Sequence, residues 1–74
     1  MTPEELQKRV VEERRLQDYK WRKKKHTDEK WCNILTEEVG EVAQSINMND
    51  TTKMKTELVQ CAAVIQAWLE QRED

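Results

Sequence analysis

Apolar residues recur at helical spacing in three stretches of the chain, which two short polar segments separate. The small hydroxyl and acidic residues that precede each stretch are typical helix N-caps. The predicted helices run from Thr2 to about Lys20 or Trp21, from Thr27 or Asp28 to about Met48, and from Asp50 or Thr51 to about Gln71. Because the connections are short, consecutive helices are expected to be antiparallel neighbours. The pattern predicts an all-α fold.

The apolar stripe of the first predicted helix turns polar halfway along. Leu6 and Val10 are followed, at the same spacing, by Glu13, Gln17 and Trp21. This change predicts that the second half of the helix faces a polar pocket. The alternative is a poorly buried helix end.

Two glutamates lie inside the apolar stripes of the other two helices. A helix turns about 100° per residue, so with Ile34 at zero, Glu38 falls at about 40°, within the apolar arc. Glu41 falls at about 340°, on the rim of that arc. Glu57 lies in the apolar arc of the third helix, and Gln60 lies on its rim. A buried carboxylate is costly unless something positive meets it, so this pattern indicates a site rather than ordinary packing.

Two such helices packed antiparallel would bring Glu38, Glu41 and Glu57 together. Like charges that close raise the pKa of at least one carboxyl group, and a divalent cation removes the repulsion. Oxygen ligands without His or Cys favour Mg²⁺ or Mn²⁺ over Zn²⁺. The alternative is that Glu38 pairs with an Arg or Lys of the first helix and that Glu57 lies at an interface. Gly40, the only glycine, either allows a helix or ligand to approach closely or has no special role.

Composition narrows the class of protein. A chain of 74 residues forms a single domain, 1–74, that is marginally stable alone, which favours self-association. Charged residues make up 38% of the chain, yet the formal net charge is only −2, which argues against a nucleic-acid binder. We see no signal peptide and no apolar run long enough to cross a membrane, so we expect a cytoplasmic protein. Cys32 and Cys61 are interpreted as reduced core residues.

The segment Glu37–Glu41 (EEVGE) resembles the EExxE motif of the MazG-like, all-α nucleoside triphosphate pyrophosphohydrolases. That superfamily continues with ExxD on the next helix, where this chain has Glu57–Gln60 (ELVQ). The surrounding sequence is similar to short phage and bacterial members, and the stretch 13–26 is similar to their N-terminal segment. The resemblance covers roughly residues 10–70.

The resemblance implies a Mg²⁺ site and a reaction. Family members bind Mg²⁺ through the positions that match Glu38, Glu41 and Glu57; the oxygen ligands leave Mn²⁺ as an alternative cation. The fourth ligand position, an Asp in the family, holds Gln60 here. An amide oxygen is a weaker ligand for a hard cation than a carboxylate, which predicts lower metal occupancy. The family reaction converts a nucleoside triphosphate to the monophosphate and pyrophosphate.

The resemblance also implies roles in catalysis and substrate binding. Glu37 is expected to orient the metal or the attacking water, and Glu37 or Glu38 to accept the proton of the water. Gln17, Lys20 and Trp21 are candidate contacts to the base, sugar and phosphates. Family members are mostly dimers or tetramers. Because three short helices cannot enclose a nucleotide, we expect a homo-oligomer that completes a four-helix-type bundle.

Some of these residues also have structural interpretations. Trp21 is alternatively a packing anchor, and Lys20 is alternatively solvated. Trp31 and Trp68 lie in apolar stripes and are predicted to pack there. His26 is expected to be in solvent unless it contacts a phosphate.

Two other functions stay open at the level of sequence. The first is a non-catalytic protein of the same fold that binds or sequesters a nucleotide or has a regulatory role, and Gln60 is its main support. The second is a helical interaction or DNA-binding module that uses the basic run 20–26.

Overall fold

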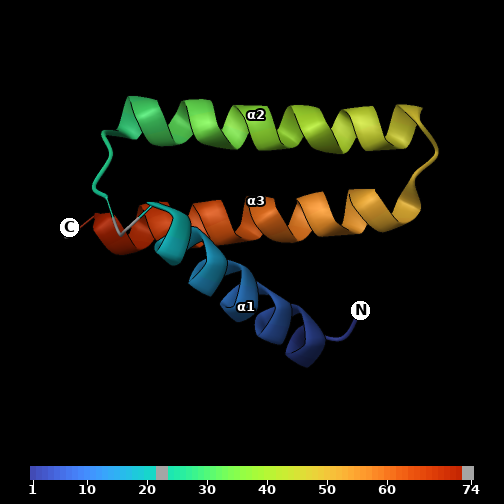
Figure 1. The fold of residues 1–74 in the computed structure, drawn as a ribbon, viewed down its shortest axis with the longest axis horizontal. Helices are drawn as coiled ribbons and strands as arrows, with labels where there is room; N and C mark the ends of the chain where they lie inside the picture. Colours follow the sequence, from blue (N-terminus) through green and yellow to red (C-terminus); the bar gives the residue numbers. More distant parts are fainter. Residues whose placement is uncertain (22–23, 73–74) are drawn as a thin grey trace.

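The computed structural model describes residues 1–21 and 24–72, except for the side chain of Trp21. Within this part, the chain forms three α-helices and no strand: α1 (Pro3–Trp21), α2 (Asp28–Asn47) and α3 (Thr51–Gln71) (Figure 1). The predicted all-α class is confirmed, and the predicted helix ends agree closely with the observed ones. No helix among the described residues is long and apolar enough to cross a membrane.

Polar side chains cap all three helices at the predicted residues. The backbone N–H groups of Glu5, Lys30 and Lys53 donate to Thr2 Oγ1 (3.1 Å), Thr27 Oγ1 (3.2 Å) and Asp50 Oδ1 (2.9 Å), respectively. These bonds satisfy backbone donors that have no partner within a helix. The turn between α2 and α3 contains Asn49 with φ at 56°, a left-handed conformation that Asn adopts more readily than most residues.

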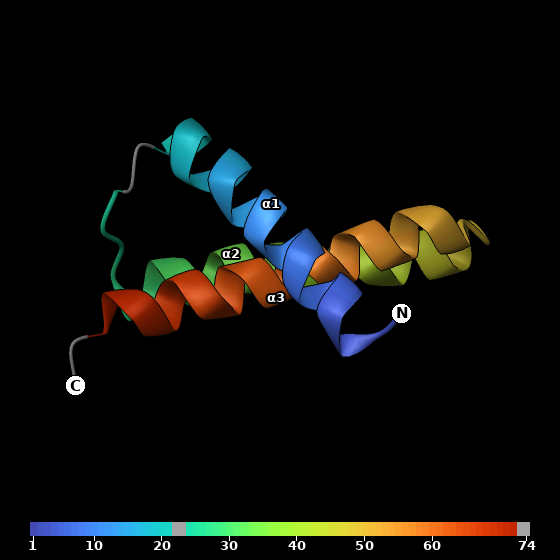
Figure 2. The same ribbon diagram turned by 90° about the horizontal axis from the view of Figure 1, so that it is seen from below.

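The three helices do not form one aligned bundle. α2 and α3 run antiparallel and side by side, as predicted (Figure 1). α1 packs on α3 but not on α2, and it crosses α3 obliquely, so that its C-terminal end lies farther from the hairpin than its middle (Figure 2). The expectation of antiparallel neighbours is therefore correct for α2 and α3, whereas α1 leans away from α2.

An apolar contact and the hydrogen bonds of Arg14, which also donates to Gln66 Oε1 at 3.0 Å, attach α1 to α3. Val10 is buried against the small side chains Val59 and Ala63 of α3. One helical turn later, Arg14 forms a two-pronged ion pair with Glu70, with nitrogen–oxygen distances of 2.6 and 3.0 Å. Ala63 is fully buried, and its small side chain lets the two helix backbones approach closely.

The contact between α2 and α3 is built around Trp31. This side chain is 2% exposed and packs with Val64 and Ala67. Trp68 is half-buried at the edge of the same cluster. Both tryptophans therefore pack as predicted.

Neither described cysteine forms a disulfide, but only Cys61 is buried. Cys32 is exposed, so the prediction that both lie in the core is wrong for this residue. On the helical wheel Cys32 lies about 160° from Ile34, outside the arc that faces α3.

Gln71 holds the segment 24–27 against the C-terminal end of α3. Its Oε1 accepts hydrogen bonds from the His26 backbone N–H and the Trp31 indole N–H, both at 3.1 Å, and its Nε2 donates to the Lys24 carbonyl at 2.9 Å. The His26 ring stands edge-on to Trp31, with ring centroids 4.8 Å apart. His26 is thus half-buried, and the expectation that it lies in solvent is wrong.

Candidate metal centre

Three glutamates meet where α2 and α3 face each other. Glu38 and Glu41 come from α2 and Glu57 from α3, and each offers a carboxylate oxygen within 4.8 Å of the other two. Glu57 is buried, Glu38 is half-buried and Glu41 is exposed, as their positions on the helical wheels predict. The structure therefore brings together the three acids that the sequence singles out, in a cluster open to solvent on the Glu41 side.

Gln60 lies against the same acids. In the amide orientation that satisfies its neighbours, its nitrogen donates to Glu57 Oε2 at 2.8 Å and to Glu38 Oε2 at 2.9 Å. A glutamine amide presents either its N–H donors or its carbonyl oxygen to a given point. Without a metal, Gln60 therefore acts as a hydrogen-bond donor between two carboxylates of different helices.

Burial and mutual repulsion raise the pKa of two of the acids. The pKa of Glu38 is raised first by burial and then by the nearby Glu41 charge, although its hydrogen bond with Glu57 acts in the opposite direction. The pKa of Glu41 is raised by its hydrogen bond with Glu57, by burial and by the Glu57 charge. None of the ion pairs in the described part of the chain involves these acids. The alternative that Glu38 pairs with a cation of the first helix is therefore wrong.

The cluster suits a hard divalent cation. Oxygens on opposite sides of a Mg²⁺ ion lie about 4.2 Å apart, since each bond is about 2.1 Å long. Neighbouring oxygens lie about 3.0 Å apart, so three carboxylate oxygens within 4.8 Å of one another are close enough to share one such ion once their side chains draw together. Burial and the charges of the three acids raise the pKa of the Cys61 thiol, which disfavours the thiolate form that binds metals.

The middle of α1 adds an unpaired polar atom to the site. Gln17 is only 7% exposed, and its Oε1 has no hydrogen-bond partner among the described residues. It lines a cleft of about 350 Å³ together with Glu13 and Lys20 of α1 and with the acid cluster and Gln60. A buried acceptor without a partner costs about 1–3 kcal/mol, which is recovered when a ligand or water donates to it. The prediction that this half of α1 faces a polar pocket is confirmed.

A second cleft, of about 500 Å³, adjoins the first along Lys20, Glu38 and Glu41, which line both. Its other lining residues are Lys24, His26, Lys30, Ile34 and Glu37. Lysines and glutamates therefore line the same pair of adjoining clefts. Such a surface accommodates an anionic ligand at one end and a cation at the other.

The predicted substrate contacts are placed unevenly. Gln17 and Lys20 line the clefts, whereas the Trp21 side chain lies outside the described part of the chain. Lys30 was not predicted, although it falls at about 320° on the wheel of α2, beside Glu41, so the same geometry identifies it. Lys24 belongs to the basic run 20–26, whose lysines the sequence offers either as an attraction for a triphosphate or as solvated charges. Helical spacing does not place it, because it lies between helices.

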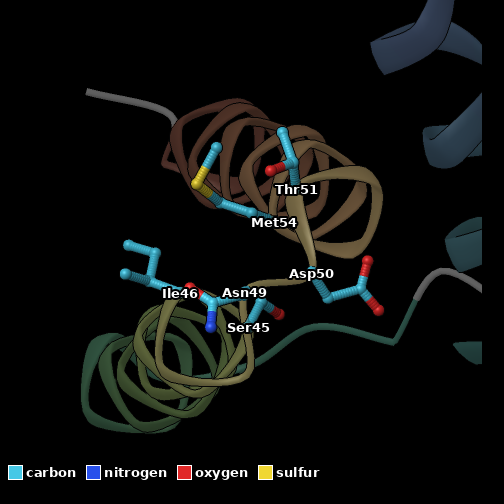
Figure 3. Close-up of a pocket in the computed structure, with 6 residues that line it drawn as sticks. All are labelled: Ser45, Ile46, Asn49, Asp50, Thr51 and Met54. Carbon is cyan, nitrogen blue, oxygen red and sulfur yellow. The ribbon is translucent and has the colours of Figure 1, made fainter.

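A smaller hollow of about 200 Å³ lies at the turn between α2 and α3 (Figure 3). It is lined by Ser45, Ile46, Asn49, Asp50, Thr51 and Met54. Figure 3 shows Ile46 and Met54 on one side of the turn and the Asp50 carboxylate on the other. Asp50 already caps α3, so this hollow holds no group of converging ligands.

Comparison with known proteins places the acid cluster within a segment that matches a protein family. A family model described as the MazG nucleotide pyrophosphohydrolase domain matches residues 26–71, more than half of the chain. The match covers all of α2 and α3, and hence the whole cluster, but none of α1. The similarity expected for the stretch 13–25 is therefore not part of it. No curated protein and no solved structure matches the chain.

Proposed function

The chain belongs to the MazG nucleotide pyrophosphohydrolase domain family, and we propose that it hydrolyses a nucleoside or deoxynucleoside triphosphate to the monophosphate and pyrophosphate with the help of Mg²⁺. One observation carries this proposal. Glu38, Glu41 and Glu57 lie within 4.8 Å of one another beside a polar cleft, inside the segment that matches the family. Acidic clusters on surfaces are common, but this one is partly buried and adjoins an unpaired amide oxygen.

Glu38, Glu41 and Glu57 would hold Mg²⁺, with the Gln60 carbonyl as a fourth oxygen donor and Mn²⁺ as the alternative cation. When bound, the cation supplies neutralisation of phosphate charge and activation of a water molecule. The raised pKa values of Glu38 and Glu41 support this assignment, because neither carboxylate forms an ion pair within the described chain and the Lys53 charge offsets only part of the rise at Glu41.

Glu37 is the leading candidate for the proton acceptor, and its neighbour Glu38 is the second. Glu37 is exposed and lines the larger cleft without belonging to the metal cluster, so its carboxylate stays free to orient a water. The water oxygen bonds to the α-phosphorus, the bond from that phosphorus to the bridging oxygen breaks, and pyrophosphate leaves. The lysines of the larger cleft neutralise the charge that the pyrophosphate carries away.

Gln17 is the candidate contact to the nucleoside. Its buried Oε1 is placed to accept a hydrogen bond from an N–H of the base or a hydroxyl of the sugar. Lys20 lines both clefts and would pair with a phosphate. Stacking of a base on Trp21 is the third element of the proposed substrate site.

A second copy of the chain would cover the side of the α2–α3 hairpin that faces away from α1. Val39 and Ile46 of α2 are 53% and 55% exposed, and Leu58 and Ile65 of α3 are 49% and 45% exposed. Each pair is seven residues apart and so shares one helix face. Figure 3 shows Ile46 on the side of the hairpin opposite α1. Two hairpins joined there form a four-helix-type bundle in a dimer or tetramer, which sedimentation analysis tests.

Incubation with the eight common ribonucleoside and deoxyribonucleoside triphosphates and MgCl₂ tests the activity. Release of pyrophosphate together with a nucleoside monophosphate from at least one of them is expected, and chromatography of the products measures both. Glu57→Gln is expected to abolish the release. Glu12→Gln, an exposed position of α1 outside both clefts, is the matched control and retains it. Release of orthophosphate with a nucleoside diphosphate contradicts the proposal.

The alternative is a nucleotide-binding protein of the same fold that does not hydrolyse its ligand. The neutral amide at position 60, which is hydrogen-bonded to two of the acids, favours it. Calorimetric titration with nucleotide in MgCl₂, combined with the pyrophosphate assay, distinguishes the two functions. Tight nucleotide binding without pyrophosphate release selects the alternative.

A further inference from the structure

Gln60 occupies the place between α2 and α3 where negative charge accumulates. In the amide orientation that satisfies its neighbours, its nitrogen lies 2.8 Å from Glu57 Oε2 and 2.9 Å from Glu38 Oε2, and so it joins two carboxylates from different helices. Hydrogen bonds to ionised acceptors are stronger than those between neutral groups. The two bonds therefore offset part of the repulsion within the cluster when no cation is bound.

The same geometry sets Gln60 against the cation. An amide nitrogen carries positively polarised hydrogens, so it cannot face a metal ion that binds the same two carboxylates. A cation in the cluster therefore displaces this hydrogen-bonded arrangement. A carboxylate at position 60 would have the opposite effects, since it would add repulsion without metal and a charged ligand with metal.

We propose that the Gln60 amide is a neutral stand-in for the cation: it bridges Glu38 and Glu57 when no metal is bound, and metal binding requires the amide to turn its oxygen toward the cluster. The cation of this chain is accordingly exchangeable rather than permanently resident. The inference rests on the proposed function only through the metal site.

A separate observation indicates that the cluster serves a ligand. Gln17 of α1 is more than nine-tenths buried and lines the same cleft, and its Oε1 has no hydrogen-bond partner among the described residues. Gln60 donates to the acids and leaves Gln17 unsatisfied. The cleft therefore keeps one acceptor that only a further ligand or water completes.

Calorimetric titration with MnCl₂ at about pH 8, after removal of metal with EDTA, tests the exchange. Gln60→Glu has nearly the same shape and is expected to bind Mn²⁺ at least about tenfold more tightly than the wild type, because it adds a charged ligand. Its metal-free form is expected to melt at a lower temperature. Gln7→Glu makes the same change of charge at an exposed position of α1 and is the matched control. Mn²⁺ affinity of Gln60→Glu within twofold of the wild type overturns the proposal.

NMR of the side-chain amides observes the turn in the wild-type chain, so the test does not depend on a variant that folds. The Gln60 amide signal, assigned in the wild type through its bond correlations to the Gln60 backbone, is expected to be shifted from the free-amide position without metal and to move again as MgCl₂ is added. The Gln7 amide is the internal reference. A Gln60 signal that stays unchanged at saturating Mg²⁺ refutes the turn.

These measurements separate the inference from the proposed function. A chain that binds the cations as described but releases no pyrophosphate refutes hydrolysis and leaves the role of Gln60 intact. A chain that hydrolyses nucleotides while its Gln60 amide signal stays unchanged on addition of Mg²⁺ refutes the role of Gln60 and leaves hydrolysis intact.

Discussion

Replacing Glu41 with glutamine is expected to stabilise the metal-free chain and to weaken its cation binding. Glu41 is exposed, and its carboxylate oxygen lies within 4.8 Å of oxygens of Glu38 and Glu57. Two unit charges at that separation repel by about 0.9 kcal/mol in water and about 3.5 kcal/mol at an effective dielectric constant of 20. Because solvent screens Glu41, we expect a value near the lower limit, about 1 kcal/mol. This corresponds to a rise in Tm of about 4–8 °C for a domain of this size.

Thermal unfolding followed by circular dichroism, with EDTA or with MgCl₂, measures both effects. Without metal, Glu41→Gln melts at a higher temperature than the wild type. A cation at ten times its Kd stabilises the wild type by about 1.4 kcal/mol, whereas the variant, with one charged ligand fewer, gains less. The difference between the two melting temperatures therefore shrinks or changes sign when Mg²⁺ is added. Glu12→Gln removes a charge at an exposed position of α1, outside the cluster and both clefts, and is the control.

The pH dependence of this effect has a defined sign. The pKa values of Glu38 and Glu41 are raised in the folded chain, so their contribution to stability is fully present below the ordinary carboxyl pKa. It is lost as the pH rises through the raised values. The metal-free wild type therefore gains stability from these two groups between about pH 8 and about pH 5, and Glu41→Gln gains less. A variant that melts below the wild type in EDTA, or that responds equally to Mg²⁺, refutes a shared site.

Three other substitutions test separate parts of the structure. Gly40→Ala is expected to raise the free energy of unfolding, measured in urea, by about 1 kcal/mol, because a methyl group there meets nothing within 4 Å. A lower free energy of unfolding in the variant would mean that a partner copy approaches this point. Gln17→Met removes an unpaired buried acceptor and is expected to stabilise the chain by about 1 kcal/mol while lowering nucleotide affinity in calorimetry; unchanged affinity excludes Gln17 as a contact. Arg14→Met releases Glu70, whose pKa the Arg14 hydrogen bond holds below its ordinary value. This ion pair stabilises the chain above the ordinary carboxyl pKa, and its contribution is lost as the pH falls through the lowered value. The urea midpoints of wild type and variant are therefore expected to differ at about pH 7 and to converge near about pH 3. A difference between the midpoints that does not change with pH contradicts the assignment.

The sequence predicts the helices and the acid cluster because both depend on short-range regularities. Thr2, Thr27 and Asp50 cap the helices through bonds to backbone groups three residues away, so their effect is local. The cluster follows from the spacing of Glu38 and Glu57 within their helices together with one short turn. That turn forces α2 and α3 to be antiparallel neighbours, and the two acids then have to face each other.

The course of α1 was not predictable in the same way. It depends on Val10 against Ala63 and on Arg14 against Glu70, pairs separated by more than fifty residues along the chain. Helical periodicity gives the face of α1 that is buried, but it does not give the neighbour or the crossing direction. The role of Gly40 was open for a similar reason, and the structure removes the interpretation of a close approach within one chain.

The arrangement separates two requirements of the proposed reaction. The acids and Gln60 lie on the α2–α3 hairpin, which Trp31 and its neighbours hold together. Gln17 and Lys20 lie on α1, which reaches the site through a different set of contacts. A change that loosens α1 is therefore expected to weaken nucleotide binding more than cation binding, because the hairpin carries every proposed cation ligand. The departure of this chain from the acidic motif is thus confined to the half of the site that is proposed to bind metal, where the Gln60 amide joins carboxylates of α2 and α3.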